Sequence, residues 1–567
     1  MLNNPNPNTP TPSEPWTNWS GNLVHQPASD GMKYYFMPTN RTELQNILSN
    51  AAKVGGITVR VSGQRHSQPP LVADDNRDKV PQTTRTYLVD LSCYKDLGSN
   101  QDQHIVLGAG KNQITVNTGV REDELDVFLT KNNLMLKTVT AGGFFSIGGM
   151  TSVDVHGGTV HAPIFAETVS AFTILLADGT VITIDEKSPA IAGWSPLQFA
   201  RVSLGSLGIV TSVTIDVLPR PYATTLQGGS TRYGIKDKSA FIAQFQTLLT
   251  NHTRLEVFFT PYATKYVDQF PLYTKNFLVL WWNVVNDPMP KIANQPPQID
   301  PQTACDFANK PQPEYGAPYL ENVIEDIAED VAIKAQFVTS PGNTPEGFLK
   351  GLYQDGISNP AIIAAIAFEQ IERQIKTANA SYSELWLTEA AQVIFMSYYI
   401  PLPEINAKGL GKVWDGLDVV SQIVTQDDNF HIAAPMEFRF VKGGNSAMSG
   451  TYYDDPNAWF VNLDLIGFVD HKQKASDYPP KLLKFFADVE REWIKMGGFP
   501  HNGKIYGFYD PSDAPGTYSK TGPFNPNFLA HLRTRRGERL LAFNTYRKSL
   551  DPKGLFFNDY LRQLLEP

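Results

Sequence analysis

The chain has 567 residues, of which 42% are hydrophobic and 19% charged, and its formal net charge is -9. This length exceeds what one hydrophobic core usually supports, so at least two domains are expected, and the composition excludes disorder or a coiled coil for the whole chain. The acidic balance argues against a nucleic-acid-binding protein. Two cysteines, Cys93 and Cys305, allow at most one disulfide and exclude a metal cluster built from cysteines.

The first fifteen residues, MLNNPNPNTPTPSEP, lack the basic start and the apolar stretch of a signal peptide. Such a polar leader is typical of the exposed end of a secreted protein whose signal has been removed. We therefore expect a secreted location, with a disordered cytosolic tail as the alternative. No apolar run reaches the length of a membrane span.

Helix and strand signals alternate from the leader to about residue 220. Residues 41–54 have apolar residues at helical spacing and stop at Gly55-Gly56, and ITVRVSG (57–63) is a predicted strand. Further strands are predicted at TYLVDL, HIVLGAG and QITVNTG, followed by a helix at REDELDVFLTKNN. An Asp178-Gly179 turn predicts a hairpin. This order indicates an α+β or α/β unit.

The pattern changes between about residues 225 and 515, where aromatic strands such as FLVLWWNVV become frequent. Pro-rich connectors occupy 286–302 and 310–318, and helices are predicted at 319–337 and 358–377. The last fifty residues return to a helical, basic pattern that ends in GLFFNDYLRQLL.

Several common motifs are absent. GAG at 108–110 lacks the third glycine of a dinucleotide-binding fingerprint, since residue 113 is Gln and a strand follows, so a hairpin is predicted. No GxxxxGK[ST] or HExxH occurs, and no carboxylate of a metal motif flanks His156 and His161. LGSLG at 204–208 lacks the GxSxG order of a hydrolase. No metal site is expected.

Two glycine-containing turns are more informative. VRVSGQRHSQPP (59–70) is a strand leading into a polar turn whose N–H groups can bind phosphate, although by itself a turn with a solvated histidine is the better explanation. AGGFFSIGGMTSVDVHGG (141–158) places small residues where a backbone must approach another group closely. Together the two turns indicate a large anionic cofactor held without a Rossmann helix.

RVSGQRHS, FSIGGMTSVDVHGG and SLGSLGIVTSVTIDV resemble the FAD-binding domain of the vanillyl-alcohol oxidase / p-cresol methylhydroxylase flavoprotein family, and DPKGLFFNDYLRQLL resembles its closing segment. The resemblance implies an α+β, two-domain flavoprotein. An FAD-binding domain of two α+β subdomains (16–222) follows a flexible leader (1–15). A substrate (cap) domain (223–517) has a large antiparallel sheet flanked by helices, and a C-terminal segment (518–567) returns to the FAD domain.

The resemblance also implies how FAD is held. In the family, the histidine of the first turn carries FAD covalently through its 8α-methyl group, and His66 occupies that position. Arg65 is a departure, because many members have glycine there. The residues implied in FAD binding are His66, Ser62, Gly63, Gln64, Arg65, Ser67, Gly142, Ser146, Ile147, Gly148, Gly149, Ser152, Val153, His156, Gly157, Gly208, Ile209, Val210 and Asn558.

Two strands of the second domain suggest the reacting groups. PMEFRFVKGG (435–444) alternates with period 2, so Glu437 and Arg439 share one face about 7 Å apart, and Glu256 lies on the predicted strand LEVFFTPYATK. A surface strand pair is the alternative. The pattern resembles type II cholesterol oxidases, which implies that these three residues lie at the flavin. A carboxylate, Glu437 or Glu256, would accept a proton, and Arg439 would stabilise developing negative charge.

HNGK (501–504) occupies the place where sugar and lactone oxidases of the superfamily have His-Trp-Gly-Lys. Asn502 in place of Trp favours a different substrate and is counted among the catalytic candidates. The resemblance implies a monomeric oxidase that converts cholesterol and related 3β-hydroxysterols with O2 to 3-ketosteroids and hydrogen peroxide. It implies transient contact with a membrane surface and no nucleic-acid partner.

An alditol, sugar or aldonolactone oxidase or dehydrogenase of the same family is the alternative. In the sterol interpretation, aromatic strand residues supply the apolar wall of the pocket: Phe258, Phe259, Trp281, Trp282, Phe438 and Phe440.

Overall fold

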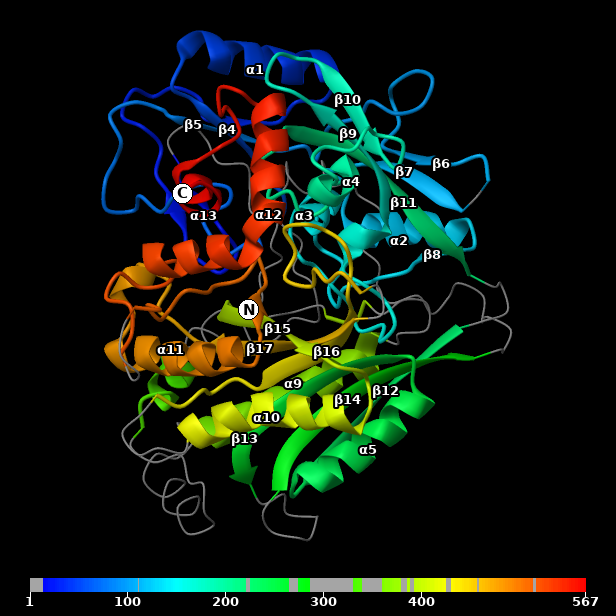
Figure 1. Ribbon diagram of the computed structural model, residues 1–567, viewed down its shortest axis with the longest axis vertical. Coiled ribbons are helices and arrows are strands. Elements are labelled where there is room, and N and C mark those ends of the chain that lie inside the picture. The colour runs from blue at the N-terminus through cyan, green and yellow to red at the C-terminus, as the bar shows by residue number, and fades with distance from the viewer. Residues whose placement is uncertain are drawn as a thin grey trace.

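The computed structural model describes residues 14–110, 112–220, 225–264, 274–285, 330–338, 359–378, 385–387, 392–424, 430–455, 458–512 and 517–567. The predicted connectors at 286–302 and 310–318, and most of the helix predicted at 319–337, lie outside these residues. Figure 1 shows two halves stacked along the long axis, with smaller sheets in the upper half and one large sheet in the lower half. Among the described residues, no helix is both long and apolar enough to cross a membrane.

The upper half begins with α1 (Arg41–Val54), which has the predicted bounds. The Asn40 side chain accepts a hydrogen bond from the Glu43 amide at its start, and Gly55 ends it with a φ of 74°. Beneath α1 lies a parallel sheet in the order β3 (Tyr35–Phe36), β5 (Thr86–Val89), β4 (Thr58–Val61). The strands β1 (Trp16–Thr17) and β2 (Val24–His25) form a separate antiparallel pair.

A second, antiparallel sheet of the upper half has the order β10-β9-β11-β7-β6, and β8 pairs with the end of β11. Both predicted hairpins are confirmed: β6 pairs with β7, and the Leu176 amide donates to the Thr180 carbonyl across the turn at Gly179. The elements are β6 (Ile105–Leu107), β7 (Gln113–Asn117), α2 (Glu122–Lys131), β8 (Leu134–Leu136), α3 (Ile147–Ser152), η1 (Phe165–Thr168), β9 (Val169–Leu175), β10 (Val181–Asp185), α4 (Pro196–Ala200) and β11 (Ile209–Pro219).

The lower half is built on an antiparallel sheet in the order β12-β14-β13-β16-β17-β15-β18. Helices α5 and α10 cover one face, while α9 packs on part of the face that looks toward the upper half. The elements are β12 (Thr225–Ile235), α5 (Lys238–Asn251), β13 (Arg254–Thr264), β14 (Thr274–Val285), α9 (Pro360–Ala378), β15 (Ile394–Leu402), α10 (Ala407–Val424), β16 (Met436–Lys442), β17 (Trp459–Gly467), η3 (Ala475–Asp477), α11 (Pro480–Lys495) and β18 (Phe499–Pro500). The predicted α+β class with a large helix-flanked antiparallel sheet is confirmed.

The C-terminal residues run back to the upper half through α12 (Pro526–Leu550) and α13 (Asp559–Leu565). Gly537 has a φ of 53° within α12, and the helix bends there. Beyond α12, the Leu555 carbonyl accepts from the Val59 amide at 2.8 Å, and the Phe556 carbonyl accepts from Arg60 Nη1 at 2.6 Å. The end of the chain therefore completes the surroundings of β4.

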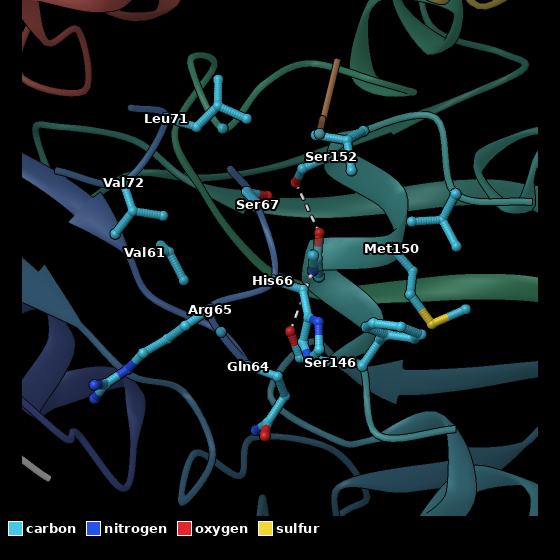
Figure 2. Close-up of a pocket in the computed structure, with 18 of the residues that line it drawn as sticks. Val61, Gln64, Arg65, His66, Ser67, Leu71, Val72, Ser146, Met150 and Ser152 are labelled. Carbon is cyan, nitrogen blue, oxygen red and sulfur yellow. Dashed lines mark hydrogen bonds between the residues drawn. The ribbon is translucent and has the colours of Figure 1, made fainter. Parts of the chain in front are cut away.

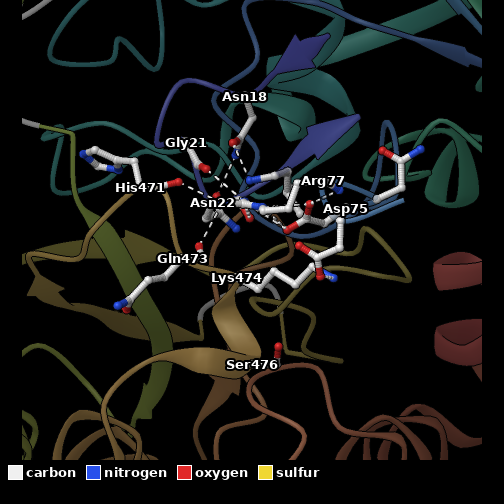
Figure 3. Close-up of polar contacts among 12 residues, drawn as sticks. Asn18, Gly21, Asn22, Asp75, Arg77, His471, Gln473, Lys474 and Ser476 are labelled. Carbon is white, nitrogen blue, oxygen red and sulfur yellow. Dashed lines mark hydrogen bonds and ion pairs between the residues drawn. The ribbon is translucent and has the colours of Figure 1, made fainter. Parts of the chain in front are cut away.

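Arg77 ties the N-terminal segment to the loop after β17 (Figure 3). Its Nη1 donates to the carbonyls of His471 and Gln473 at 2.8 and 2.9 Å, and its Nη2 donates to the carbonyl of Asn22 at 2.9 Å. Its Nε donates to the Asp75 carboxylate. One guanidinium thus connects two segments that are almost 400 positions apart in the sequence.

Candidate active site

A cavity of about 240 Å³ is lined by residues of both halves. The upper half contributes the turn after β4, the segment around α3, and residues at the start of β11. The lower half contributes Arg439 from β16, Asp464 from β17, and His501, Gly503 and Lys504 that follow β18. Figure 2 shows the part of the lining in which His66 lies beside Ser146 of the α3 segment.

Arg65 adopts a φ of 63°, the left-handed region that favours glycine. This explains why glycine is common at the position, and neighbouring groups explain how an arginine is accepted. Its carbonyl accepts from the Trp19 amide at 2.9 Å, and its Nη2 donates to the Tyr35 hydroxyl at 3.1 Å. The Tyr35 hydroxyl in turn donates to Asp90 at 2.7 Å. These contacts hold the turn in the conformation that glycine would adopt unaided.

The His66 ring is fixed by aromatic contacts. It stacks between Trp19 and Phe144, at centroid distances of 4.8 and 5.1 Å, and meets Phe145 edge-on at 4.7 Å. Burial, and then the positive charges of Lys504 and Arg121, hold the pKa of His66 well below its ordinary value. Its Nε2 is buried and has no hydrogen-bond partner among the described residues. The turn therefore presents a neutral ring nitrogen at the cavity wall.

Glycines allow α3 to pack closely against the turn on one side and against Thr118, after β7, on another. A Cβ on Gly63 would come within 2.2 Å of Ser146 Oγ, and a Cβ on Gly148 would come within 2.8 Å of Thr118 Cβ. Ser146 caps α3 by accepting from the Gly149 amide. At these contacts the cavity wall therefore consists of backbone and small side chains, as the glycine spacing predicts.

The orphaned polar atoms of the wall fit a large polar cofactor such as FAD. Besides His66 Nε2, the buried atoms Gln64 Oε1 and His156 Nδ1 lack hydrogen-bond partners within the described part of the chain. Both residues line the cavity. Because buried polar atoms normally have partners, these atoms indicate a ligand that supplies them.

Most residues predicted to bind FAD line the cavity: Ser62, Gly63, Gln64, Arg65, His66, Ser67, Gly142, Ser146, Gly148, Gly149, Ser152, Val153, His156, Gly208 and Val210. Four others do not. Ile147 and Ile209 are completely buried in the hydrophobic core, and Gly157 packs against the Val139 carbonyl. Asn558 caps α13 by accepting from the Leu561 amide and donates to the Pro70 carbonyl.

Arg439 joins the two predicted carboxylates. Its Nε donates to Glu437 Oε1 at 2.6 Å, and its Nη2 donates to Glu256 Oε2 at 3.2 Å. Arg439 is 8% exposed and Glu437 9%, so the alternative of a surface pair is wrong. Burial by itself lowers the pKa of Arg439. The negative charges of Glu256 and Glu437 together raise it by more, so the pKa of Arg439 lies above its ordinary value. Of these three residues, Arg439 lines the cavity and the two glutamates lie behind it.

Two further charged residues of the lining, Asp464 and Lys504, were not predicted from the sequence. Asp464 is the register partner of Glu437 across β16 and β17, and both Asp464 and Lys504 line the cavity. Burial, followed by the charge of Glu437, raises the pKa of Asp464. An acidic residue inside the apolar strand FVNLDLIG was the signal that could have identified it.

Asn502 is not part of the cavity lining, which corrects its assignment as a catalytic candidate. Its Nδ2 donates to Asp154 Oδ2 at 2.6 Å and to the Met448 carbonyl at 3.0 Å, and its Oδ1 accepts from Arg536 at 2.8 Å. The side chain thus points away from the cavity. Its neighbours His501, Gly503 and Lys504 line the cavity.

The expected aromatic wall is also wrong, because none of its six residues lines the cavity. Phe259, Trp281, Phe438 and Phe440 lie on the opposite face of the sheet, where Phe438 packs against Phe245 of α5 at a centroid distance of 5.6 Å. Phe258 and Trp282 pack with Phe368 of α9 in a separate cluster.

Comparison with known proteins gives two family matches. Residues 32–185 match the model of an FAD binding domain, and residues 360–564 match the model of D-arabinono-1,4-lactone oxidase. The chain is 25% identical over 252 residues to the D-arabinono-1,4-lactone oxidase of Yarrowia lipolytica, covering 44% of this chain and 41% of that protein. It is 27% identical over 186 residues to the L-gulonolactone oxidase of Mus musculus, covering 33% and 37%. The matches thus span about two fifths of these relatives.

A further relative has the name of a dehydrogenase. The L-gulono-1,4-lactone dehydrogenase of Mycobacterium tuberculosis is 26% identical over 250 residues, covering 44% of this chain and 50% of that protein. Among solved structures, a solvent-stable cholesterol oxidase has a TM-score of 0.66 at 18% identity, covering 97% of both chains. The cholesterol oxidase from B. sterolicum has a TM-score of 0.64 at 15% identity, covering 100% of this chain and 99% of that chain. At these identities, the likeness shows the fold alone.

The comparisons overturn the cholesterol oxidase assignment. The sequence relatives and the model that matches residues 360–564 are lactone oxidases or dehydrogenases, which supports the stated alternative. The expected membrane contact depended on a sterol substrate and has no separate support. The FAD-binding match over residues 32–185 and the lactone oxidase match over residues 360–564 support the resemblance to the vanillyl-alcohol oxidase / p-cresol methylhydroxylase flavoprotein family.

Proposed function

We propose that the protein is an FAD-dependent oxidoreductase that oxidises a ring hydroxyl of an aldono-1,4-lactone. One observation carries the proposal: the segment that matches the D-arabinono-1,4-lactone oxidase model supplies the polar groups of the lower half at the cavity. These groups are Arg439, Asp464, His501 and Lys504.

The chemistry of this end of the cavity favours a polyhydroxylated substrate. A buried hydroxyl without a partner costs about 1–3 kcal/mol, so a lactone with several hydroxyls needs several converging polar groups. Arg439, Asp464 and Lys504 can donate to or accept from such hydroxyls, and His156 and His501 lie beside them. The six aromatic residues that would suit an apolar substrate lie elsewhere.

We further propose that His66 holds FAD covalently, since its unpartnered Nε2 lies at the cavity wall. The glycines of the His66 turn and of α3 would allow the backbone to approach the cofactor. When bound, FAD supplies the acceptor for the two electrons and the carbon-bound hydrogen of the alcohol. Arg439 would stabilise negative charge on the substrate oxygen, and Glu437 and Glu256 would hold its guanidinium in place.

The test is a panel of D-arabinono-1,4-lactone, L-gulono-1,4-lactone, xylitol and cholesterol, each assayed with oxygen and with an artificial electron acceptor. We expect kcat/KM for one of the lactones to exceed the values for xylitol and cholesterol by about tenfold or more, because a site built for hydrogen bonds rejects analogues that lack them. A higher value for xylitol or cholesterol would contradict the lactone proposal. The ratio of the rate with oxygen to the rate with the artificial acceptor distinguishes an oxidase from a dehydrogenase.

A further inference from the structure

We propose that Asp464 accepts the proton of the substrate hydroxyl, whereas Glu437 and Glu256 position Arg439. This inference rests on the proposed oxidation of an alcohol at the cavity. It assigns different tasks to three carboxylates that lie on the same face of one sheet.

Access to the cavity separates the three groups. Asp464 lines the cavity, and neither Glu437 nor Glu256 does. Asp464 lies on β17, where its register partners are Glu437 on β16 and Ser397 on β15. Its Oδ1 is buried and has no hydrogen-bond partner within the part of the chain that the structure describes. An oxygen of Asp464 is therefore available to a ligand.

The two glutamates are already engaged. Glu256 is completely buried, and its Oε2 accepts from Trp386 Nε1 at 2.9 Å and from Arg439 Nη2 at 3.2 Å. Glu437 Oε1 accepts from Arg439 Nε at 2.6 Å. A carboxylate that must keep a guanidinium in place loses that contact when it takes up a proton. These hydrogen bonds therefore suit positioning rather than proton transfer.

The charges around Asp464 suit a proton acceptor. From β16 it faces Glu437 and Arg439, from the segment after β18 it faces Lys504, and from β15 it is close to Tyr399. Burial and Glu437 raise its pKa, while Lys504, Ser397 and Arg439 oppose this effect. A base whose pKa is raised toward neutrality accepts a proton more readily than an ordinary carboxylate does.

Each group that leaves the alcohol during the oxidation has an acceptor. The O–H bond of the alcohol breaks and its proton goes to Asp464, while the C–H bond breaks and its hydrogen leaves with the bonding electron pair for FAD. A carbonyl forms between the same carbon and oxygen. Arg439, at the cavity wall beside Asp464, stabilises the oxygen as the proton leaves.

The test compares Asp464→Asn and Glu437→Gln in the full-length holoprotein, with Asp216→Asn on β11 as a control outside the cavity lining. Anaerobic stopped-flow measurements over a range of lactone concentrations separate the limiting rate of flavin reduction from the Kd. We expect Asp464→Asn to lower the limiting rate about 10²–10⁴-fold with a nearly unchanged Kd. In wild type and in Glu437→Gln, kcat/KM should fall at acidic pH as the base becomes protonated. In Asp464→Asn this fall (the acid limb of the pH profile) should be absent. Asp216→Asn should behave as wild type does.

Thermal unfolding supplies a readout that needs no turnover. Since the pKa of Asp464 is raised in the folded state, the folded protein binds this proton more tightly than the unfolded chain does. Stability should therefore fall as the pH rises from the ordinary Asp range through the raised pKa, and Asp464→Asn should lose this part of the slope.

Two results would overturn the inference: an acid limb that survives in Asp464→Asn but disappears in Glu437→Gln, or a weaker Kd with an unchanged limiting rate. If wild type oxidises no lactone, the proposed function fails instead. The same variants then decide the role of Asp464 with whichever alcohol of the panel is oxidised.

Discussion

Asp464 and Glu437 are direct cross-strand partners on β17 and β16, so two carboxylates lie side by side on the sheet face that meets the cavity. Two positive groups, Arg439 and Lys504, lie close enough to shift the pKa of Asp464. With Glu256, the cluster holds three carboxylates and two cations. Burial, followed by the negative charge of Glu437, raises the pKa of Asp464, which suits a group that takes up a proton.

Replacing Arg439 with Met should destabilise the protein and impair oxidation. Glu437 and Glu256 would remain buried without this guanidinium, which we expect to cost about 3–5 kcal/mol in the free energy of unfolding. We expect kcat/KM to fall about 10²-fold or more. Urea unfolding and steady-state kinetics measure the two effects. The double variant Glu437→Gln/Arg439→Met should lose less than the sum of the single variants, and strictly additive losses would show that the residues act independently.

Changing His66 to Ala should abolish covalent flavin attachment while leaving the fold intact. After denaturing electrophoresis, flavin fluorescence should migrate with the wild-type chain and be absent from the variant band. His161→Ala changes an exposed histidine outside the cavity lining and should keep the fluorescent band. Flavin released from denatured wild-type protein would rule out the covalent link but not FAD binding.

A methyl group at Gly63 should disturb the contact between the His66 turn and α3. Its Cβ would lie 2.2 Å from Ser146 Oγ, so Gly63→Ala should lower the Tm and the FAD content of the purified protein. Ser146→Ala removes the clashing oxygen at the cost of a helix cap worth about 0.5–2 kcal/mol. We expect the double variant to be no worse than Ser146→Ala alone. If Gly63→Ala lowers the Tm and the FAD content as much in the Ser146→Ala background as in wild type, the added methyl group clashes with an atom other than Ser146 Oγ.

Glu122 should make stability depend on pH. Burial raises the pKa of its carboxyl to about 8, while the Thr140 amide donates to Oε1 at 2.8 Å. The folded state therefore holds a proton that the unfolded chain releases near its ordinary pKa, and stability should fall as the pH rises toward about 8. Glu122→Gln should flatten this part of a plot of Tm against pH. Glu186→Gln, at an exposed position, should keep the wild-type slope.

Local patterns predicted the elements that depend on nearby residues. The helix 41–54, the Asp178-Gly179 hairpin and the alternation around Glu437 follow from spacing and turn chemistry within a few residues. The cavity depends instead on pairing between strands that are distant in the sequence. Asp464 enters it because β17 pairs with β16, and Lys504 because β18 joins the edge of the same sheet.

The errors about the substrate have the same origin. A period of two separates Phe438 and Phe440 from Glu437 and Arg439, but it does not say which face meets the cofactor domain. The face with Glu437 and Arg439 meets the cofactor domain, and the face with Phe438 and Phe440 packs beneath α5 and α10. Asn502 was misassigned because a side chain in a tight turn has no regular direction. The hydrogen bonds to Asp154 and Arg536 set its direction.

The hydrogen bonds from Val59 and Arg60 to Leu555 and Phe556 have a consequence for biosynthesis. The turn that holds His66 is near the beginning of the chain, but its supporting strand is complete only when the last residues have left the ribosome. Arg77 likewise can form its hydrogen bonds to the carbonyls of His471 and Gln473 only after those residues have been synthesised. Domains often fold during synthesis, N-terminal parts first, but these contacts form only after the C-terminal residues have been made. We therefore expect stable flavin binding only after residues 555 and 556 have been synthesised, and a nascent chain stalled before residue 555 should remain colourless.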